Sequence, residues 1–187
     1  MNDISIKKQL YNQTPLRILS FLSLYPEKLF SAGEISKQTK SSKGATNQLL
    51  RLFLLLDILS REKKGNLFLY KINFESFLLR QFKIFENSVK LQPIIKEIKP
   101  YCWEIILFGS CADGSNAENS DIDIFIKSEH KNKIRKIINK YDEDFKIRPV
   151  IQDSLELVSA QKTDSVFFEQ IRKGIVIWKG RPSHEEI

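Results

Sequence analysis

Two aspartates at alternate positions, Asp121 and Asp123, are the residues of this chain best placed to do chemistry. They open the apolar run "DIDIFIK", which follows another apolar run, "CWEIILFG", after a glycine turn and a polar loop. Both runs are typical of buried strands, and side chains alternate along a strand, so the two carboxylates should project to one face. Charged residues are rarely buried unless they are paired or bind a metal. Mg²⁺ is the natural counter-charge, because it binds one or two carboxylates together with phosphate oxygens.

The glycine turn ahead of the aspartates supplies a second part of a candidate site. Gly109 allows the backbone to come close to a ligand. Ser110 offers a hydroxyl and a backbone N–H at the start of a helical turn, where anions bind well. Ten residues separate Ser110 from Asp121. The alternative interpretation, a turn cap at the start of a strand, explains one aspartate but not two on one face.

Gly109-Ser110, ten residues and then Asp121-x-Asp123 resemble the signature of the minimal nucleotidyltransferases of the DNA polymerase beta superfamily. The flanking "LFGS" and "SDID" are similar to that family as well, and the resemblance covers roughly residues 93–180. It implies that Gly109 and Ser110 bind the phosphates of a nucleoside triphosphate, with ATP as the first expectation. It also implies that Asp121 and Asp123 are catalytic residues that bind Mg²⁺.

Two positions depart from the family pattern. Asp113 stands where many relatives have a basic residue, and its charge would repel phosphate. The family's third carboxylate, a base or second-metal ligand, lies on a later strand, for which the matching run is "FKIRPVIQD". Arg148 holds the equivalent place, and Asp144 and Asp153 are not convincing substitutes. Pro149 predicts that this strand lies at an edge of the sheet.

The elements ahead of this site indicate a different module. Residues 10–73 contain the patterns of three helices, the second opened by the capping-box spacing of Ser31 and Glu34 and the third beginning at about Ser42. The run "LSREKKGNLFLYKIN" then alternates like two strands around a turn at 64–66. Three helices followed by a hairpin resemble a winged helix-turn-helix domain.

The third helix would be the recognition helix, placed in the major groove of DNA. Its core face is predicted at Ala45, Leu49, Leu52 and Leu56. The residues expected to meet DNA lie on its other face and at the wing tip: Ser42, Lys43, Thr46, Asn47, Gln48, Arg51, Lys63, Lys64 and Asn66. A protein-interaction scaffold is the alternative, but a basic and amide-rich face favours DNA.

Residues 74–100 are expected to be linker helices, with Pro93 near the start of a second one and Pro100 closing it. An apolar stripe recurs at spacings of three or four residues: Phe74, Leu78, Phe82, Phe85 and Val89. The stripe would either pack against one of the two domains or form a homodimer, since winged-helix proteins often bind two half-sites. Both alternatives stay open.

The expected fold class is therefore α+β. A winged helix-turn-helix domain is expected in residues 1–73, linker helices in 74–100, and a nucleotidyltransferase-like mixed β-sheet flanked by helices in 101–182.

Charge separates the two halves as well. Residues 1–90 carry 15 Lys/Arg against 7 Asp/Glu, or +8, and the rest carry 15 against 16, or −1, which together give the net +7. The basic half suits a polyanion. The sequence has no apolar run long enough to span a membrane and no signal-peptide pattern at its start. We therefore expect a cytoplasmic protein. Cys102 and Cys111 lack zinc-ligand spacing, and a structural disulfide between them is not expected in a reducing compartment.

Two functions from different classes stay open. The first is an Mg²⁺-dependent enzyme that transfers a nucleotide, AMP first, to a hydroxyl of a protein or a small molecule. Similar small nucleotidyltransferases occur in toxin–antitoxin pairs, so the resemblance implies a separate helical toxin as partner. The second is a winged-helix transcriptional regulator whose catalytically degenerate domain binds a nucleotide or nothing.

Overall fold

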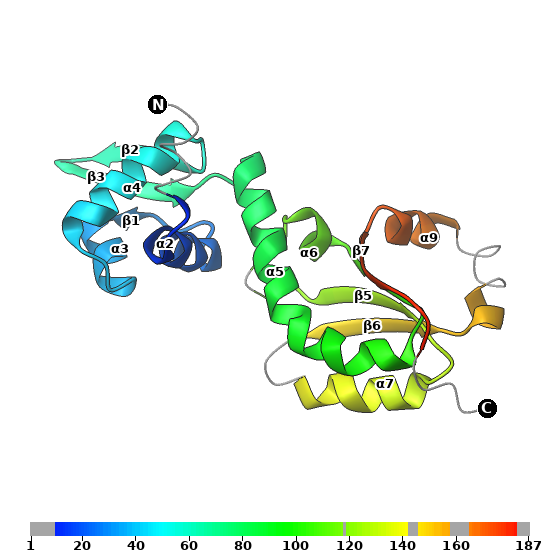
Figure 1. Cartoon of the computed structure of the whole chain (residues 1–187). Coiled ribbons are helices and arrows are strands. Elements are labelled where there is room, and N and C mark those ends of the chain that lie inside the picture. The colour runs from blue at the N-terminus through cyan, green and yellow to red at the C-terminus, as the bar shows by residue number, and fades with distance from the viewer. Residues whose placement is uncertain (1–9, 118, 142–145, 158–164, 183–187) are drawn as a thin grey trace. The chain divides into compact units, whose positions relative to one another are not determined.

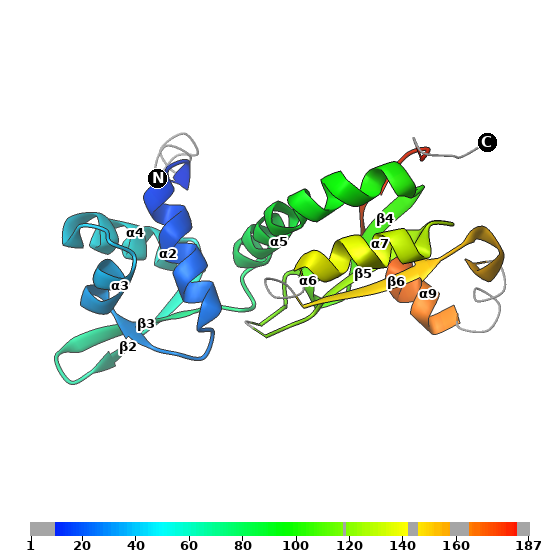
Figure 2. The same cartoon turned by 90° about the horizontal axis from the view of Figure 1, so that it is seen from below.

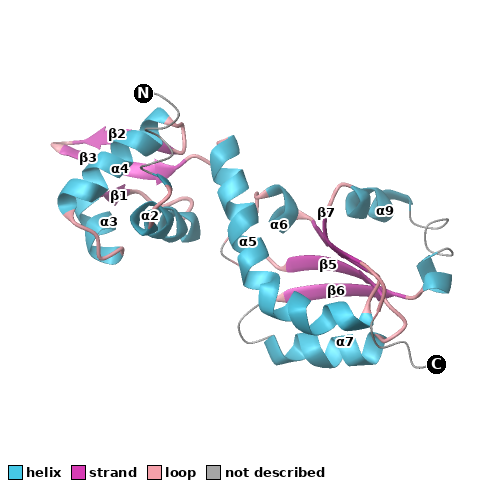
Figure 3. Cartoon of the chain, in the orientation of Figure 1, coloured by secondary structure: helices cyan, strands magenta, loops and turns pink. Residues whose placement is uncertain are grey.

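The computed structural model describes residues 10–117, 119–141, 146–157 and 165–182 (Figure 1). The chain divides into two compact units, Met1–Arg80 and Gln81–Ile187. Each unit combines helices with a β-sheet of its own (Figure 3). The fold class is thus α+β, as the sequence predicts. Across the described ranges, no helix is both long enough and apolar enough to cross a membrane.

The first unit has the topology of a winged helix-turn-helix domain. Its elements in chain order are α2 (Gln13–Leu24), β1 (Phe30–Ser31), α3 (Ala32–Gln38), α4 (Lys43–Leu55), β2 (Leu59–Lys64) and β3 (Leu67–Ile72). The strands form an antiparallel sheet in the order β1-β3-β2. The predicted helices and the hairpin that follows them are confirmed.

Local chemistry explains where these elements begin and turn. The Ser31 side chain accepts a hydrogen bond from the Glu34 backbone N–H, and the Glu34 carboxylate accepts one from the Ser31 N–H, so the predicted capping box opens α3. In the hairpin Lys64 pairs with Leu67, which leaves a two-residue turn. Gly65 occupies that turn with a φ of +61°, a conformation that glycine adopts without strain.

The second unit is a four-stranded mixed sheet with helices on both faces. Its elements are α5 (Phe77–Ile98), η1 (Lys99–Tyr101), β4 (Glu104–Phe108), α6 (Ser110–Asp113), β5 (Ile122–Lys127), α7 (Lys131–Ile138), η2 (Asn139–Tyr141), β6 (Ile147–Gln152), α9 (Ser165–Arg172) and β7 (Ile175–Lys179). The strand order is β6-β5-β4-β7, with β5 and β6 parallel and the other pairs antiparallel. Pro149 lies in β6 at the sheet edge, as predicted.

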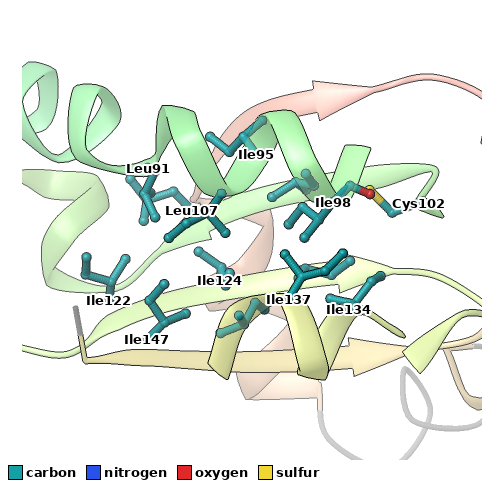
Figure 4. Packing of buried hydrophobic residues seen from close by; sticks show 14 of the residues in the cluster. Leu91, Ile95, Ile98, Cys102, Leu107, Ile122, Ile124, Ile134, Ile137 and Ile147 are labelled. Atoms are coloured by element: carbon teal, nitrogen blue, oxygen red, sulfur yellow. The ribbon is translucent and has the colours of Figure 1, made fainter. Parts of the chain in front are cut away.

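Alternating residues of the strands belong to two separate apolar clusters, one on each face of the sheet. Ile105 and Leu107 of β4, with Ile124 of β5, pack against α5 and α7 (Figure 4). Ile106 and Phe108 face the other way and pack with α9. The two views agree that α5 and α7 lie on one face of the sheet and α9 on the other (Figures 1 and 2). Any side chain on the α9 face therefore lies outside the larger core.

One expectation for the linker region, two separate helices, is wrong. A single helix, α5, runs through Pro93. Proline removes the hydrogen bond to the carbonyl four residues earlier, but that residue, Val89, is 54% exposed, so water can replace the bond.

Much of the predicted apolar stripe is exposed in the single chain, which disfavours packing against a domain and leaves the homodimer alternative a prediction. Leu78 and Phe85 are 43% and 58% exposed. The buried row is one residue further on: Leu79, Lys83, Asn87, Leu91, Ile94 and Ile98. Two polar residues, Lys83 and Asn87, interrupt that row, so in the sequence it resembles an exposed face.

Candidate functional site

The carboxylates lie on one face of the sheet, at the start of β5. Ile122 and Ile124 are buried in the core against α5 and α7. Asp121 and Asp123 alternate with them and so lie on the α9 face, as the sequence predicts. Asp123 pairs with Phe108 of β4 on one side and with Arg148 of β6 on the other.

The glycine turn approaches the second carboxylate closely. Gly109 directly follows Phe108, the partner of Asp123 across the sheet. Its φ is +69°, and a Cβ atom at this position would lie 2.8 Å from Asp123 Oδ2. The backbone conformation therefore favours glycine here, and a Cβ atom would have to displace the Asp123 carboxylate. The residues that the sequence separates by a loop are brought together at one end of the β4–β5 pair.

The turn that follows is a single helical turn, α6, which begins at Ser110. The backbone N–H groups of Ala112 and Asp113 donate to the Gly109 carbonyl at 3.0 and 3.3 Å. The Asp113 carboxylate accepts a hydrogen bond from the Ser115 N–H at 2.8 Å, so it stabilises its own loop. Ser110 itself is half-buried.

An ion pair occupies the position of the family's third carboxylate. Arg148 Nη2 lies 2.8 Å from Asp121 Oδ2. The Arg148 side chain is 72% exposed, so water screens this pair, and its contribution to stability is at most about 1 kcal/mol. The pair can therefore open readily when a stronger ligand for Asp121 is present.

The electrostatics of Asp123 favour a bound cation. Partial burial raises the pKa of Asp123 above its ordinary value, and the neighbouring charge of Asp121 raises it further, while the Arg148 guanidinium acts in the opposite direction. A carboxylate that is costly to ionise in this way gains from a counter-ion.

The two carboxylates, Asp121 and Asp123, are enough ligands for Mg²⁺ that is also bound by nucleotide phosphates, but too few to hold a metal ion by themselves. Two carboxylates beside a glycine turn match the one or two carboxylates that Mg²⁺ takes with phosphate oxygens. Among the described residues there is no group of three or more His, Cys, Asp or Glu that could hold a metal ion. Asp153 is engaged elsewhere, with Lys131 Nζ at 2.7 Å. Asp144 lies outside the described residues.

Cys111 is buried next to the site, and its thiol is not reactive. It is buried, and its thiol donates to the Asp121 carbonyl at 3.5 Å. Burial raises its pKa to about 11, so it stays protonated near neutral pH. A protonated, buried thiol is a structural residue rather than a nucleophile.

Sequence reasoning missed two polar residues of α5 that contact this site's loop. Lys83 and Asn87 are buried and hydrogen-bond to the segment after Ser110. Their spacing of four, in register with Leu79 and Leu91, is the signal that could have identified them, because it places them in a buried row.

The predicted DNA-contacting residues of the first unit are exposed, with one exception. On α4 and the wing the exposed ones are Ser42, Lys43, Asn47, Gln48, Arg51, Lys63, Lys64 and Asn66. Thr46 is fully buried, so including it in the DNA-contacting set was wrong. Its hydroxyl donates to the Ser42 carbonyl at 3.0 Å and lies 2.8 Å from the Ser41 hydroxyl. These two contacts connect the turn between α3 and α4 to the first turn of α4.

The sequence pattern of the family described as "Polymerase beta, Nucleotidyltransferase" matches residues 89–182, half of the chain. The chain belongs to this nucleotidyltransferase family. The match spans the end of α5, the whole sheet and α9, and it includes Gly109, Asp121 and Asp123. The matched residues therefore contain the glycine turn, both aspartates and Arg148.

Similar solved structures each cover about half of the chain with low scores. HlyU from Vibrio cholerae, in its reduced form, is 17% identical over 50% of this chain and 85% of its own, with a TM-score of 0.32. A candidate nucleotidyltransferase from Sulfolobus solfataricus is 19% identical over 52% of this chain and 87% of its own, with a TM-score of 0.34. Scores this low do not establish a shared fold. No curated protein is similar enough in sequence to count as a relative.

Proposed function

We propose that this chain binds a magnesium–nucleoside triphosphate, ATP in the first instance, in its nucleotidyltransferase domain and binds DNA through its winged helix. The observation that carries the proposal is the pair Asp121 and Asp123 on one face of the sheet at the start of β5, with the Asp123 carboxylate beside the Gly109 turn. A pair of carboxylates beside a glycine-only turn suits phosphates bridged by a divalent ion.

In this proposal each residue has a separate task. Asp121 and Asp123 hold the metal ion, and Gly109 with Ser110 lies against the β- and γ-phosphates. Mg²⁺, when bound, would stabilise the charge that develops during an in-line displacement. The α9 face of the sheet at Phe108 and Phe125 would border the site and limit its contact with water.

Transfer of AMP to a hydroxyl of a protein or small molecule is the reaction that the family membership suggests. Such a step also needs a group that removes the proton from the acceptor hydroxyl. Arg148 lies beside Asp123 at the expected position and stays charged at all ordinary pH values, so it cannot act as a base. We therefore propose that transfer is slow in isolation and that a partner protein, such as a helical toxin in a toxin–antitoxin pair, supplies the missing group.

The ion pair between Arg148 and Asp121 favours a second candidate function. If Arg148 stays on Asp121, the domain can bind a nucleotide without turning it over. The chain would then be a DNA-binding regulator with a catalytically degenerate sensor domain.

An assay with labelled nucleoside triphosphates separates the two candidates. The parent and Arg148→Asp are incubated with each labelled triphosphate and Mg²⁺, with and without the protein encoded next to it. Label transfer that is faster in Arg148→Asp supports the enzyme with a missing carboxylate. Absence of transfer in every mixture, with nucleotide binding intact, supports the regulator.

A further inference from the structure

Two polar side chains of α5 are buried where apolar ones would be expected. Lys83 is 4% exposed and Asn87 is 3% exposed, in a row that also holds Leu79 and Leu91. Burying an ammonium group costs free energy because the group loses water. Burial also lowers the pKa of Lys83, while the negative charge of Asp113 acts in the opposite direction. A lysine in this place therefore needs a reason beyond filling space.

Both side chains bond to the same segment, Cys111–Asn116. Lys83 Nζ donates to the Asn116 carbonyl. Asn87 Nδ2 donates to the Cys111 carbonyl at 3.0 Å and to Asn116 Oδ1 at 3.1 Å. The Asn116 N–H in turn donates to the Ser110 carbonyl at 3.2 Å. A continuous set of hydrogen bonds thus links α5 to the turn that begins at Gly109 and Ser110.

The ammonium group does more here than satisfy a carbonyl. A neutral amide such as Asn87 already shows that hydrogen bonds to this segment need no charge. Lys83 adds a positive charge next to a loop whose own charged residue, Asp113, is negative. A negative charge in this loop would oppose phosphate, and an opposite charge held nearby in a partly dry environment offsets it strongly.

We propose that Lys83 and Asn87 are positioning residues that hold the Gly109–Asn116 turn in the shape that accepts a polyphosphate, and that Lys83 offsets the negative charge of Asp113 there. The inference rests on the proposed nucleotide binding. It adds that these residues make the site bind a triphosphate more tightly than a monophosphate. Neither residue touches the reacting atoms; both act through the loop.

Amide hydrogen exchange tests the positioning role without any nucleotide. Lys83→Met keeps the length of the side chain and removes its charge, and Asn87→Ala removes the two amide bonds. Exchange of residues 110–116 should rise about tenfold or more in each variant, since these hydrogen bonds hold the segment closed. Lys96→Met is the matched control, because Lys96 is exposed on the same helix. Unchanged exchange in both α5 variants would overturn the inference, and Asn87→Ala serves alone if Lys83→Met does not fold.

Nucleotide affinities test the charge. Calorimetric titration with Mg²⁺ should show Lys83→Met losing about tenfold in affinity for ATP and much less for AMP, because a lysine charge acts on the polyphosphate. The double variant Lys83→Met/Asp113→Asn should regain most of the ATP affinity, which a merely structural role would not allow. Equal losses for ATP and AMP, or no rescue, would overturn the charge role. A parent that binds no nucleotide would instead overturn the proposed function, and the exchange experiment would still decide whether the two residues hold the loop.

Discussion

At the scale of single residues, the site depends on one close approach. Gly109 follows β4 and Asp123 lies in β5, and a Cβ atom at Gly109 would lie 2.8 Å from Asp123 Oδ2. The sequence predicted glycine, serine and two aspartates as a set because their spacing is a pattern within one stretch of chain. It could not predict that Arg148 pairs with Asp121, because that pair depends on the register of two strands.

Gly109→Ala should destabilise the second unit by about 1–3 kcal/mol, because alanine rarely adopts this backbone conformation and its Cβ would press on Asp123. Both tryptophans, Trp103 and Trp178, lie in the second unit, so the urea midpoint followed by tryptophan fluorescence reports on that unit. Gly44→Ala is the control: a Cβ there meets nothing within 4 Å, and Gly44 lies in the first unit. An unchanged midpoint in Gly109→Ala would contradict the left-handed backbone conformation at Gly109.

At the scale of elements, helix α5 is where sequence and structure differ most. Periodicity selected the apolar residues of its exposed face, since it cannot weigh polar residues that are buried by hydrogen bonds. The strands were easier to predict, because β-branched runs bounded by a glycine turn have few alternative structures. The start of α4 at Ser42 was predicted correctly, but its buried face was predicted only in part, because Thr46, Leu50 and Phe53 are buried as well.

The packing of α5 against η2 should make stability depend on pH. Tyr141 donates a hydrogen bond to Glu97, and Lys140 lies 3.2 Å from the same carboxylate. Tyr141 first, and then Lys140, holds the pKa of Glu97 below its ordinary value. A lowered carboxyl pKa stabilises the fold above the unfolded-state pKa of about 4.3, and this stability is lost as the pH falls through the folded-state pKa.

Tyr141→Phe should therefore weaken the acid dependence of the second unit. Urea midpoints between neutral pH and about pH 3, followed by tryptophan fluorescence, measure this dependence for parent and variant. The curves should differ near neutral pH and converge in acid. Parallel curves over the whole range would show that the Tyr141–Glu97 bond does not stabilise the fold.

A second prediction at the scale of elements concerns DNA binding by the exposed face of α4. Lys43→Ala/Asn47→Ala/Arg51→Ala should weaken binding to duplex DNA by about 1–3 kcal/mol for each side chain that reads a base, as measured by fluorescence anisotropy. Asn132→Ala/Arg135→Ala/Lys136→Ala is the control, because it also removes one amide and two positive charges, from the exposed face of α7 in the second unit. Equal effects of the two triple variants would indicate non-specific attraction rather than a recognition helix.

At the scale of the whole molecule, the division of charge matches the division into units. The basic half coincides closely with the winged-helix unit, and the nearly neutral half holds the nucleotidyltransferase domain. Composition and motifs together were enough to predict two modules and their classes. The order of strands in the sheet and the α5 residues that contact the Gly109–Asn116 turn required the structure, because they depend on contacts between segments far apart in the chain.

DNA affinity should fall steeply with salt, because lysines and arginines that neutralise phosphates release counterions. The logarithm of the binding constant, measured at several salt concentrations, should decrease linearly with the logarithm of salt concentration. Nucleotide affinity of the second unit should change much less over the same range. A salt-independent DNA affinity would contradict a phosphate-tracking surface on the first unit.

Calorimetric titration with magnesium–ATP tests the central claim most directly. The parent is compared with Asp121→Asn, Asp123→Asn and the control Asp153→Asn, whose carboxylate bonds to Lys131 instead. The parent and the control should bind magnesium–ATP alike, and each of the other variants should bind about tenfold more weakly or worse, because an amide is a poor ligand for Mg²⁺. Equal affinity in all four proteins would contradict a metal–nucleotide site at the two aspartates.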